Sequence, residues 1–434
     1  MEIIEAGWVL PIDPWEVIPD GAVAIANGRV VSVGTAAQVR QSHPRATRTR
    51  LPDHVLLPGL VNGHTHAAMT LLRGVADDVP LMTWLHEHIW PIEGRWVDPQ
   101  FVADGTLLAS AEMLSGGVTC FADMYFFPQA AIEATQKAGI RIMSGQVIVD
   151  GATPYALDAE DHITKGMQIM RANEGRDLVH FSLAPHAPYT VSDATLSLVV
   201  ELCEQSDLPL NIHVHETLAE IEEGTVRYGQ RPLARLERLG VVNPRLIAAH
   251  AVHLTDDEIA LLAERDAALV HCPTSNLKLA SGIARLRDWL HAGLRVGLGT
   301  DGTASNNRLD LLSEMRLASL LAKGSTGDAT ALPARESLYA ATLGGAQALG
   351  LSDEIGSLTP GKAADMIAVD MSDFELAPVY DVVSHLVNCV ERRHVRQVWV
   401  AGTPRVQDGE LVDLYLGELT RMARRWQERI KPAR

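Results

Sequence analysis

Cysteine is scarce in this sequence, and its few copies are scattered. Cys120, Cys203, Cys272 and Cys389 are the only four among 434 residues, and they form no C-x-x-C pair. Such spacing argues against a disulfide framework and is typical of a protein kept reduced in the cytoplasm. The opening MEIIEAGWVLPID lacks the basic start and apolar core of a signal peptide. No uninterrupted apolar run is long enough to span a bilayer, so we expect a cytoplasmic protein.

Several ligand-binding signatures are also missing. No G-x-G-x-x-G follows a strand-like segment and no G-x-x-x-x-G-K occurs, which argues against an open nucleotide-binding sheet. The H-x-E…P-C-x-x-C pattern of cytidine-type deaminases is absent as well. Basic residues are outnumbered, with 37 Lys and Arg against 54 Asp and Glu, for a formal net charge of −17. Because an acidic surface repels phosphate backbones and anionic lipids, we expect neither nucleic acid nor membrane as a partner.

What the chain does contain is a long alternation of strand-like and helix-like segments. Helical stretches such as DATLSLVVELCEQ and TDDEIALLAERD separate most of the apolar runs. Eight such units predict an α/β fold, a (β/α)8 TIM barrel, over residues 57–362. The strand candidates are LLPGLVNGHTH, GVTCFADMY, IRIMSGQVIV, VHFSLAPHAPY, PLNIHVHE, RLIAAHAVHL, AALVHCPTS and RVGLGTDG.

Both ends of the chain read as short strands joined by turns. Asn27-Gly28 marks a hairpin near the start, and Asp408-Gly409 marks a turn near the end. Neither end has enough strands for a stable sheet of its own. We therefore expect one small β-sandwich, with residues 1–56 as its first half. Residues 363–434 supply the second half and a C-terminal helix.

Histidines and carboxylates gather where the predicted strands end. The carboxyl ends of barrel strands form the active-site face of this fold. Two histidines spaced i, i+2 on a strand point to the same side, and histidine with carboxylate can bind zinc. These strand ends therefore predict a metal site without cysteine. The segments are His64-Thr65-His66, His213 with Glu216, His250, and Asp301.

Each part of this pattern also has a plainer interpretation. A lone H-x-H is a weak signal, and Asp301 could simply cap the following helix. In PLNIHVHET, His213 and His215 share a face, whereas Glu216 has the opposite parity. The chain must turn inward at that point for Glu216 to reach the site. We therefore expect His213 to bind metal, Glu216 to act as general acid and base, and His215 to have a supporting role.

The number of metal ions can be predicted from the fourth strand. Two-metal barrel hydrolases commonly bridge their ions with a carboxylated lysine on this strand. The segment VHFSLAPHAPYT contains no lysine. A single metal ion is therefore expected.

These motifs resemble the amidohydrolase superfamily, in particular its 5-methylthioadenosine/S-adenosylhomocysteine deaminases. The resemblance covers nearly the whole chain. Those enzymes hydrolyse the 6-amino group of an adenine nucleoside to the inosine analogue and ammonia. The motifs that carry it are PGLVNGHTHAAMTLLRG, PIEGRW, APHAPYTVS, HVHET, HCPTSNLKLASG, LGTDGTASNN and IGSLTPGKAADMIAVD.

The resemblance implies a ligand set and a cofactor. Zn²⁺, one per subunit, would be held by His64, His66, His213 and Asp301, with Fe²⁺ or another divalent metal as the alternative. Glu216 would move protons. His250 would hold the attacking hydroxide, and Asp301 would pass a proton to the departing ammonia.

It also implies how substrate is held. Glu93 would bond the ribose hydroxyls, and His186 would bond the sugar or the ring. Read alone, either residue could be an ordinary surface or loop residue. The expected partner is a small-molecule nucleoside, and the chain is expected to form a homo-oligomer.

One departure from the family concerns the 5′ substituent. Some relatives place an arginine after the third strand to meet the carboxylate of S-adenosylhomocysteine, but SGQVIVDGATPYALD has none. Met82, Trp84 and Leu85 could instead wall an uncharged methylthio group. The alternatives left open are a guanine or 8-oxoguanine deaminase, a triazine hydrolase, and a non-catalytic binding or assembly protein.

Overall fold

The computed structural model describes residues 1–431 and contains two eight-stranded sheets. The first sheet is parallel throughout and runs β5-β6-β7-β8-β9-β10-β11-β12 in sequence order. Most of its strands are buried on both faces, which explains their unbroken apolar runs. The strands are β5 Leu60–Thr65, β6 Val118–Tyr125, β7 Arg141–Ile148, β8 Val179–Pro185, β9 Leu210–Val214, β10 Leu246–His250, β11 Ala268–His271 and β12 Arg295–Leu298.

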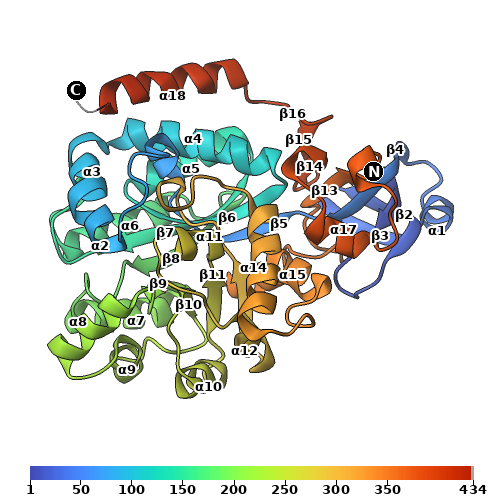
Figure 1. Cartoon of the computed structure of the whole chain (residues 1–434). Helices are drawn as coiled ribbons and strands as arrows, with labels where there is room; N and C mark the ends of the chain where they lie inside the picture. The colour runs from blue at the N-terminus through green and yellow to red at the C-terminus, as the bar shows by residue number, and fades with distance from the viewer. Residues whose placement is uncertain (432–434) are drawn as a thin grey trace.

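Helices follow these strands and enclose the sheet, so the predicted barrel is confirmed (Figure 1). Polar caps begin several of them: Ser192 accepts from Thr195 N–H, and Thr255 forms a capping box with Glu258. The main barrel helices are α4 Pro99–Ser115, α5 Pro128–Ala138, α6 Ala159–Ala172, α7 Asp193–Ser206, α8 Leu218–Tyr228, α9 Pro232–Arg238, α10 Asp256–Glu264, α12 Leu286–His291 and α14 Leu311–Thr326.

Shorter helices fill the loops between these elements. One wall of the barrel mouth is a single run made of α2 Leu81–Thr83, a π-helical segment Trp84–Ile89 and α3 Trp90–Trp96. The others are η1 Ala67–Leu72, α11 Pro273–Lys278, α13 Thr303–Asn306, α15 Ala334–Ala341 and α16 Leu343–Ala348.

The two ends of the chain share the second sheet. Its order is β16-β15-β14-β13-β4-β1-β2-β3, and the first and last parts of the chain meet where β4 pairs with β13. Blue and red strands accordingly lie together in Figure 1. The strands are β1 Glu2–Val9, β2 Ile18–Ala26, β3 Arg29–Thr35, β4 Thr47–Pro58, β13 Met366–Asp370, β14 Val395–Val400, β15 Thr403–Gln407 and β16 Glu410–Leu411.

The two ends of the chain, which were predicted to join in one small β-sandwich, thus join in one hydrogen-bonded sheet. Its boundaries stay a prediction: β4 continues to Pro58, and β13 begins at Met366. The second predicted half, residues 363–434, includes 432–434, which lie outside the described residues. The remaining helical segments are α1 Ala36–Ser42, η3 Phe374–Leu376, α17 Val382–Asn388, η4 Arg392–His394 and α18 Leu416–Ile430.

The C-terminal helix α18 returns to the barrel and lies along α4 (Figure 1). Trp426 packs edge-on against Phe101 of α4, and its indole N–H donates to Asp104 at 2.8 Å. Over residues 1–431, no helix combines the length and apolarity needed to cross a bilayer.

A buried ion pair joins the barrel to the second sheet. Arg141, at the start of β7, donates to both carboxylate oxygens of Asp365 at 3.2 and 3.3 Å. Asp365 lies just before β13 and also accepts the Ala401 N–H at 2.7 Å. Both side chains of the pair are only 2% exposed. Removing the Arg141 guanidinium would leave the buried Asp365 carboxylate without its positively charged partner.

Arg141→Met should therefore destabilise the protein by about 3–5 kcal/mol, the usual cost of breaking a buried pair from one side. Denaturant titration followed by tryptophan fluorescence measures the change. Arg245→Met is the matched control, because its partner Asp207 is 90% exposed. An exposed pair is worth at most about 1 kcal/mol. Equal losses for the two variants would contradict the role given to the Arg141–Asp365 pair.

Candidate functional site

A cavity of about 400 Å³ opens at the carboxyl ends of the barrel strands. The sequence-predicted residues His66, His186, His213, Glu216, His250 and Asp301 line it. Glu93 and Trp84 reach it from the helical run after β5. His64 lies beneath them in the same cluster, 1% exposed. The structure thus brings all nine of these residues to one place.

Three histidines of the cluster are oriented by hydrogen bonds from Nδ1, the ring nitrogen that faces away from the centre of the cluster. His66 Nδ1 faces the Met124 carbonyl at 2.6 Å, and His213 Nδ1 faces the His186 carbonyl at 2.6 Å. His250 Nδ1 faces Asn276 Oδ1 at 2.8 Å. Because these oxygens can only accept, each Nδ1 carries the proton. In the neutral ring, each Nε2 then presents a lone pair to the centre of the site.

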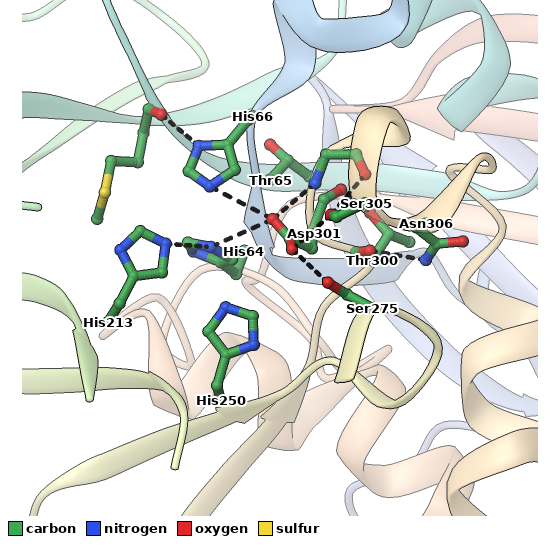
Figure 2. Close-up of polar contacts among 12 residues, drawn as sticks. His64, Thr65, His66, His213, His250, Ser275, Thr300, Asp301, Ser305 and Asn306 are labelled. Atoms are coloured by element: carbon green, nitrogen blue, oxygen red, sulfur yellow. Dashed lines mark hydrogen bonds and ion pairs between the residues drawn. The ribbon is translucent and has the colours of Figure 1, made fainter. Parts of the chain in front are cut away.

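The electron-rich atoms meet one another at the centre (Figure 2). His64 Nε2 lies 3.1 Å from His213 Nε2, and Asp301 Oδ1 lies 3.3 Å from His66 Nε2 and 3.7 Å from His64 Nε2. Burial lowers the pKa of His64 and His213 well below the usual range, which favours their neutral forms. Neutral rings and a carboxylate facing inward fit a divalent cation.

Two overlapping sets of ligand atoms have the compactness of a metal site. One comprises His64, His66 and Asp301, and the other His64, His213 and His250, with the ligand atoms of each set within 4.8 Å of one another. His250 therefore lies as close to the centre as the four residues predicted to bind metal. The donor set, nitrogen and oxygen without sulfur, suits zinc.

The Asp301 carboxylate is held from behind. Its Oδ2 accepts hydrogen bonds from the hydroxyls of Ser275 at 2.6 Å and Ser305 at 2.7 Å. Its Oδ1 accepts the Gly302 N–H at 2.7 Å and faces the histidines. Although burial would raise its pKa, the neighbouring His66 and His250 hold the pKa of Asp301 below its ordinary value. Asp301 is thus an anion with one oxygen directed into the cluster.

Three residues at the site, at or just after the ends of their strands, have left-handed backbone conformations. His215, His250 and Asp301 have φ of 52°, 68° and 61°. Such values are uncommon for residues other than glycine and cluster at functional sites. At His215 the turn ends the alternation of β9, and Glu216 therefore reaches the cavity despite its parity.

Glu216 stands beside His250, not among the close metal-facing atoms. Its Oε2 lies 4.0 Å from His250 Nε2, and Ser281 Oγ donates to its Oε1 at 3.5 Å. Burial raises the pKa of the Glu216 carboxyl. Although burial favours a neutral imidazole at His250, the nearby carboxylates of Glu216 and Asp301 raise the pKa of His250. Glu216 and His250 can therefore hold protons near the reacting centre.

His215 lies away from the cavity, as its predicted supporting role requires. Its Nε2 accepts the Leu233 N–H at 3.1 Å, and its Nδ1 lies 3.6 Å from Glu258. These contacts attach the end of β9 to α9 and α10.

A third carboxyl group, that of Glu93, also lines the cavity. Glu93 is 6% exposed and accepts a 2.6 Å hydrogen bond from the Tyr125 hydroxyl. Burial raises the pKa of Glu93 to about 7, despite that bond. His186 Nδ1 lies 3.1 Å from Thr190 Oγ1, and burial lowers the pKa of His186 to about 4. Near neutral pH the cavity therefore offers a neutral histidine at His186 and, at Glu93, a partly ionised carboxyl group that accepts hydrogen bonds in either form.

Apolar side chains form the rest of the wall. Trp84 and Leu85 line the cavity as expected, but Met82 does not, so that part of the prediction is wrong. In the helical run that begins at Leu81, Met82 packs against the apolar core instead. Within residues 1–431, no lysine or arginine lines the cavity. The other apolar residues are Met69, Leu81, Ile89, Trp90, Met124, Phe126, Val147, Val149, Ala152, Pro154 and Leu279.

Several supporting residues were not predicted. Tyr125 contacts Glu93, Asn276 orients His250, and Ser275 and Ser305 bind Asp301. Ser275 and Asn276 lie in HCPTSNLK and Ser305 in LGTDGTASNN, so the motifs marked the segments. Ser305 lies four residues after its partner Asp301, but the other three contact residues 26 to 32 positions away, whose proximity the sequence does not reveal.

Comparison with known protein families gives a match over most of the chain. The model described as amidohydrolase family matches residues 55–405. The bacterial imidazolonepropionase-like composite domain matches residues 21–46. A relative from Teredinibacter turnerae, named 5-methylthioadenosine/S-adenosylhomocysteine deaminase, is 44% identical over 98% of this chain and 97% of its own.

Solved structures agree with this comparison. A zinc-bound adenosine deaminase from Xanthomonas campestris is 48% identical, with a TM-score of 0.98 over 100% of this chain and 99% of its own. The zinc complex of an atrazine chlorohydrolase from Arthrobacter aurescens has a TM-score of 0.91 at 24% identity over 98% of this chain and 100% of its own. The second likeness is one of fold alone.

Proposed function

The chain belongs to the amidohydrolase family, and from that premise we propose that it is a zinc-dependent hydrolytic deaminase of adenine nucleosides. Its product would be the inosine analogue, with release of ammonia. The observation that carries the proposal is the meeting of a histidine–aspartate cluster with the Glu216 carboxylate in one cavity. Relatives named as deaminases of 5-methylthioadenosine and S-adenosylhomocysteine, or of adenosine, support the substrate class.

The zinc ligands in this proposal are His64, His66, His213 and Asp301. Their support is the set of inward lone pairs and the short distances around His64 Nε2. Zinc supplies one piece of chemistry when bound: it lowers the pKa of water so that a nucleophile forms near neutral pH. The protein fixes the orientation of His66, His213 and Asp301 through the hydrogen bonds made behind them.

Proton transfer falls to residues beside the ligands. Glu216 accepts the proton of the attacking water and delivers it to the ring nitrogen next to the carbon under attack, making that carbon electrophilic. The raised pKa of its buried carboxyl suits a group that must both take and give a proton. His250 stabilises the charge that develops on the attacking oxygen. Asp301 takes the remaining proton of that oxygen and passes it to the departing ammonia.

Glu93 and His186 hold the nucleoside. The Glu93 carboxylate accepts hydrogen bonds from the ribose hydroxyls, and Tyr125 holds it in place. His186 contacts the sugar or the ring. A free base such as guanine has no ribose hydroxyls to bond with Glu93. Glu93 and His186 therefore favour a nucleoside substrate over a free base or a triazine. Assembly into a homo-oligomer stays a prediction.

The first test concerns the metal. The purified protein should contain close to one zinc equivalent by elemental analysis, and His64→Ala and Asp301→Ala should lose it. Exposed His291 offers a control, because His291→Ala removes an imidazole without touching the cluster. Two tightly bound equivalents in the wild type would contradict a mononuclear site.

The second test concerns Glu216. Glu216→Gln should keep zinc while kcat falls at least about 10²-fold, the usual contribution of general acid–base catalysis. Elemental analysis and an ammonia-release assay measure the two quantities on one sample. Loss of metal in this variant would make Glu216 a ligand and would reopen the assignment of His213.

The third test concerns the 5′ substituent. A carboxylate left unpaired in this apolar wall loses hydration without a countercharge, whereas a methylthio group gains from burial. We expect kcat/KM to be higher for 5′-methylthioadenosine than for S-adenosylhomocysteine, with adenosine in between or close behind. Ammonia release from these three, guanine and 8-oxoguanine measures the ranking.

Two results of that panel would change the proposal. A preference for S-adenosylhomocysteine would show that a cation reaches the pocket from elsewhere, and the deaminase assignment would stand. Turnover of guanine or 8-oxoguanine alone would favour the alternative amidohydrolase activities. No turnover of any compound by the zinc-loaded protein would favour a binding role.

A further inference from the structure

A buried carboxylate that the reaction does not use lies directly behind Glu216. Glu220, at the start of α8, is 6% exposed. Its Oε1 accepts the N–H of His215 at 2.8 Å, and its Oε2 accepts the N–H of Glu216 at 2.8 Å. Both oxygens are thus bonded to the turn that leaves β9.

The local sequence would ordinarily use this side chain for another purpose. Thr217 and Glu220 have the S/T-x-x-E spacing of a capping box, in which the glutamate accepts the N–H of the capping residue itself. Only half of that motif is present. Thr217 Oγ1 accepts the Glu220 N–H at 3.2 Å, but the Glu220 carboxylate bonds the two residues before the cap. Glu220 therefore stabilises the turn rather than the helix end.

That turn decides where Glu216 points. His215 has a φ of 52°, a conformation that L-residues adopt only when their surroundings hold them in it. The side chain of His215 is fixed by Leu233 N–H, and its backbone N–H by Glu220. Without the second restraint, residue 215 could return to extended backbone and carry the Glu216 carboxylate away from His250.

We propose that Glu220 is a positioning residue for the reaction: by accepting both N–H groups it fixes the turn that directs the Glu216 carboxylate into the cavity. The inference rests on the proposed role of Glu216 as acid and base. Burial raises the pKa of Glu220 to about 7 against the opposing effect of the two N–H donors, which fits a carboxylate placed for its backbone contacts and not for solvent.

Glu220→Gln tests this with little change of shape. The amide keeps one acceptor oxygen, and its NH₂ then faces the second N–H, so one of the two restraints is lost. We expect kcat to fall by about tenfold or more, while KM changes less than about threefold and zinc content stays at the wild-type level. Glu222→Gln is the matched control, since Glu222 is exposed on the same helix and should leave all three values unchanged.

A double-variant cycle separates positioning from general support of the fold. If Glu220 acts through Glu216, adding Glu220→Gln to Glu216→Gln should lower the residual kcat by less than about twofold. An equal loss in both backgrounds would overturn the proposal, as would a wild-type kcat in Glu220→Gln. Where Glu220→Gln yields no folded protein, Glu220→Asp, which keeps the charge on a shorter side chain, enters the same cycle.

The cycle also keeps this inference distinct from the proposed function. Full turnover in Glu216→Gln would refute the acid–base role of Glu216 itself. A strongly impaired Glu216→Gln beside a fully active Glu220→Gln would leave the proposed function intact and refute only the positioning role.

Discussion

The barrel closes at the same residues that form the candidate metal site. The segment that follows its last strand, β12, is joined to its first strand, β5, by the bond from Asp301 N–H to the His64 carbonyl at 3.0 Å. Below it, Asn62 bonds both the N–H and the hydroxyl of Thr300 at 2.9 and 2.7 Å. Gly299 permits the two segments to approach each other, because a Cβ at this position would lie only 3.0 Å from the Cβ of His64. A cation shared by His64 and Asp301 would hold the same two strands together, so metal binding and barrel closure support each other.

The backbone at the strand ends is strained because the side chains there must point into the mouth of the barrel. Left-handed backbone at His215, His250 and Asp301 costs about 1–2 kcal/mol for each residue. The cost is met by hydrogen bonds that a regular strand end would not need: Glu220 to the turn at His215, Asn276 to His250, and two serines to Asp301. These bonds leave the site preorganised in the absence of substrate, which electrostatic catalysis requires.

Burial alone would raise the pKa of every carboxyl group in the cavity, but the neighbours of each group make these pKa values differ. It raises the pKa of Glu93 to about 7 and that of Glu216 also upward, whereas the surrounding histidines hold Asp301 below its ordinary value. Carboxylates whose pKa values are driven apart can take different roles within one cavity. Asp301 suits an anion in the resting site, free to take up a proton during the reaction, and Glu216 suits a group that both accepts and delivers a proton.

The sequence by itself determined the barrel and the segments that build its mouth. Apolar runs ending in histidine or aspartate reveal β5, β9, β10 and β12, because a strand buried on both faces needs a continuous apolar run. The same pattern located Glu216, whereas Glu93 was indicated only by the resemblance of PIEGRW to the family motif. Tertiary structure alone decided which side chains stand behind the site. Tyr125, Ser275 and Asn276 contact residues that lie 32, 26 and 26 positions away in other elements, and their spacing along the chain carries no trace of those contacts. The spacing of Thr217 and Glu220 does not reveal the contact of Glu220 either, because the turn at His215 offers the buried carboxylate two N–H groups that only the folded chain brings to it.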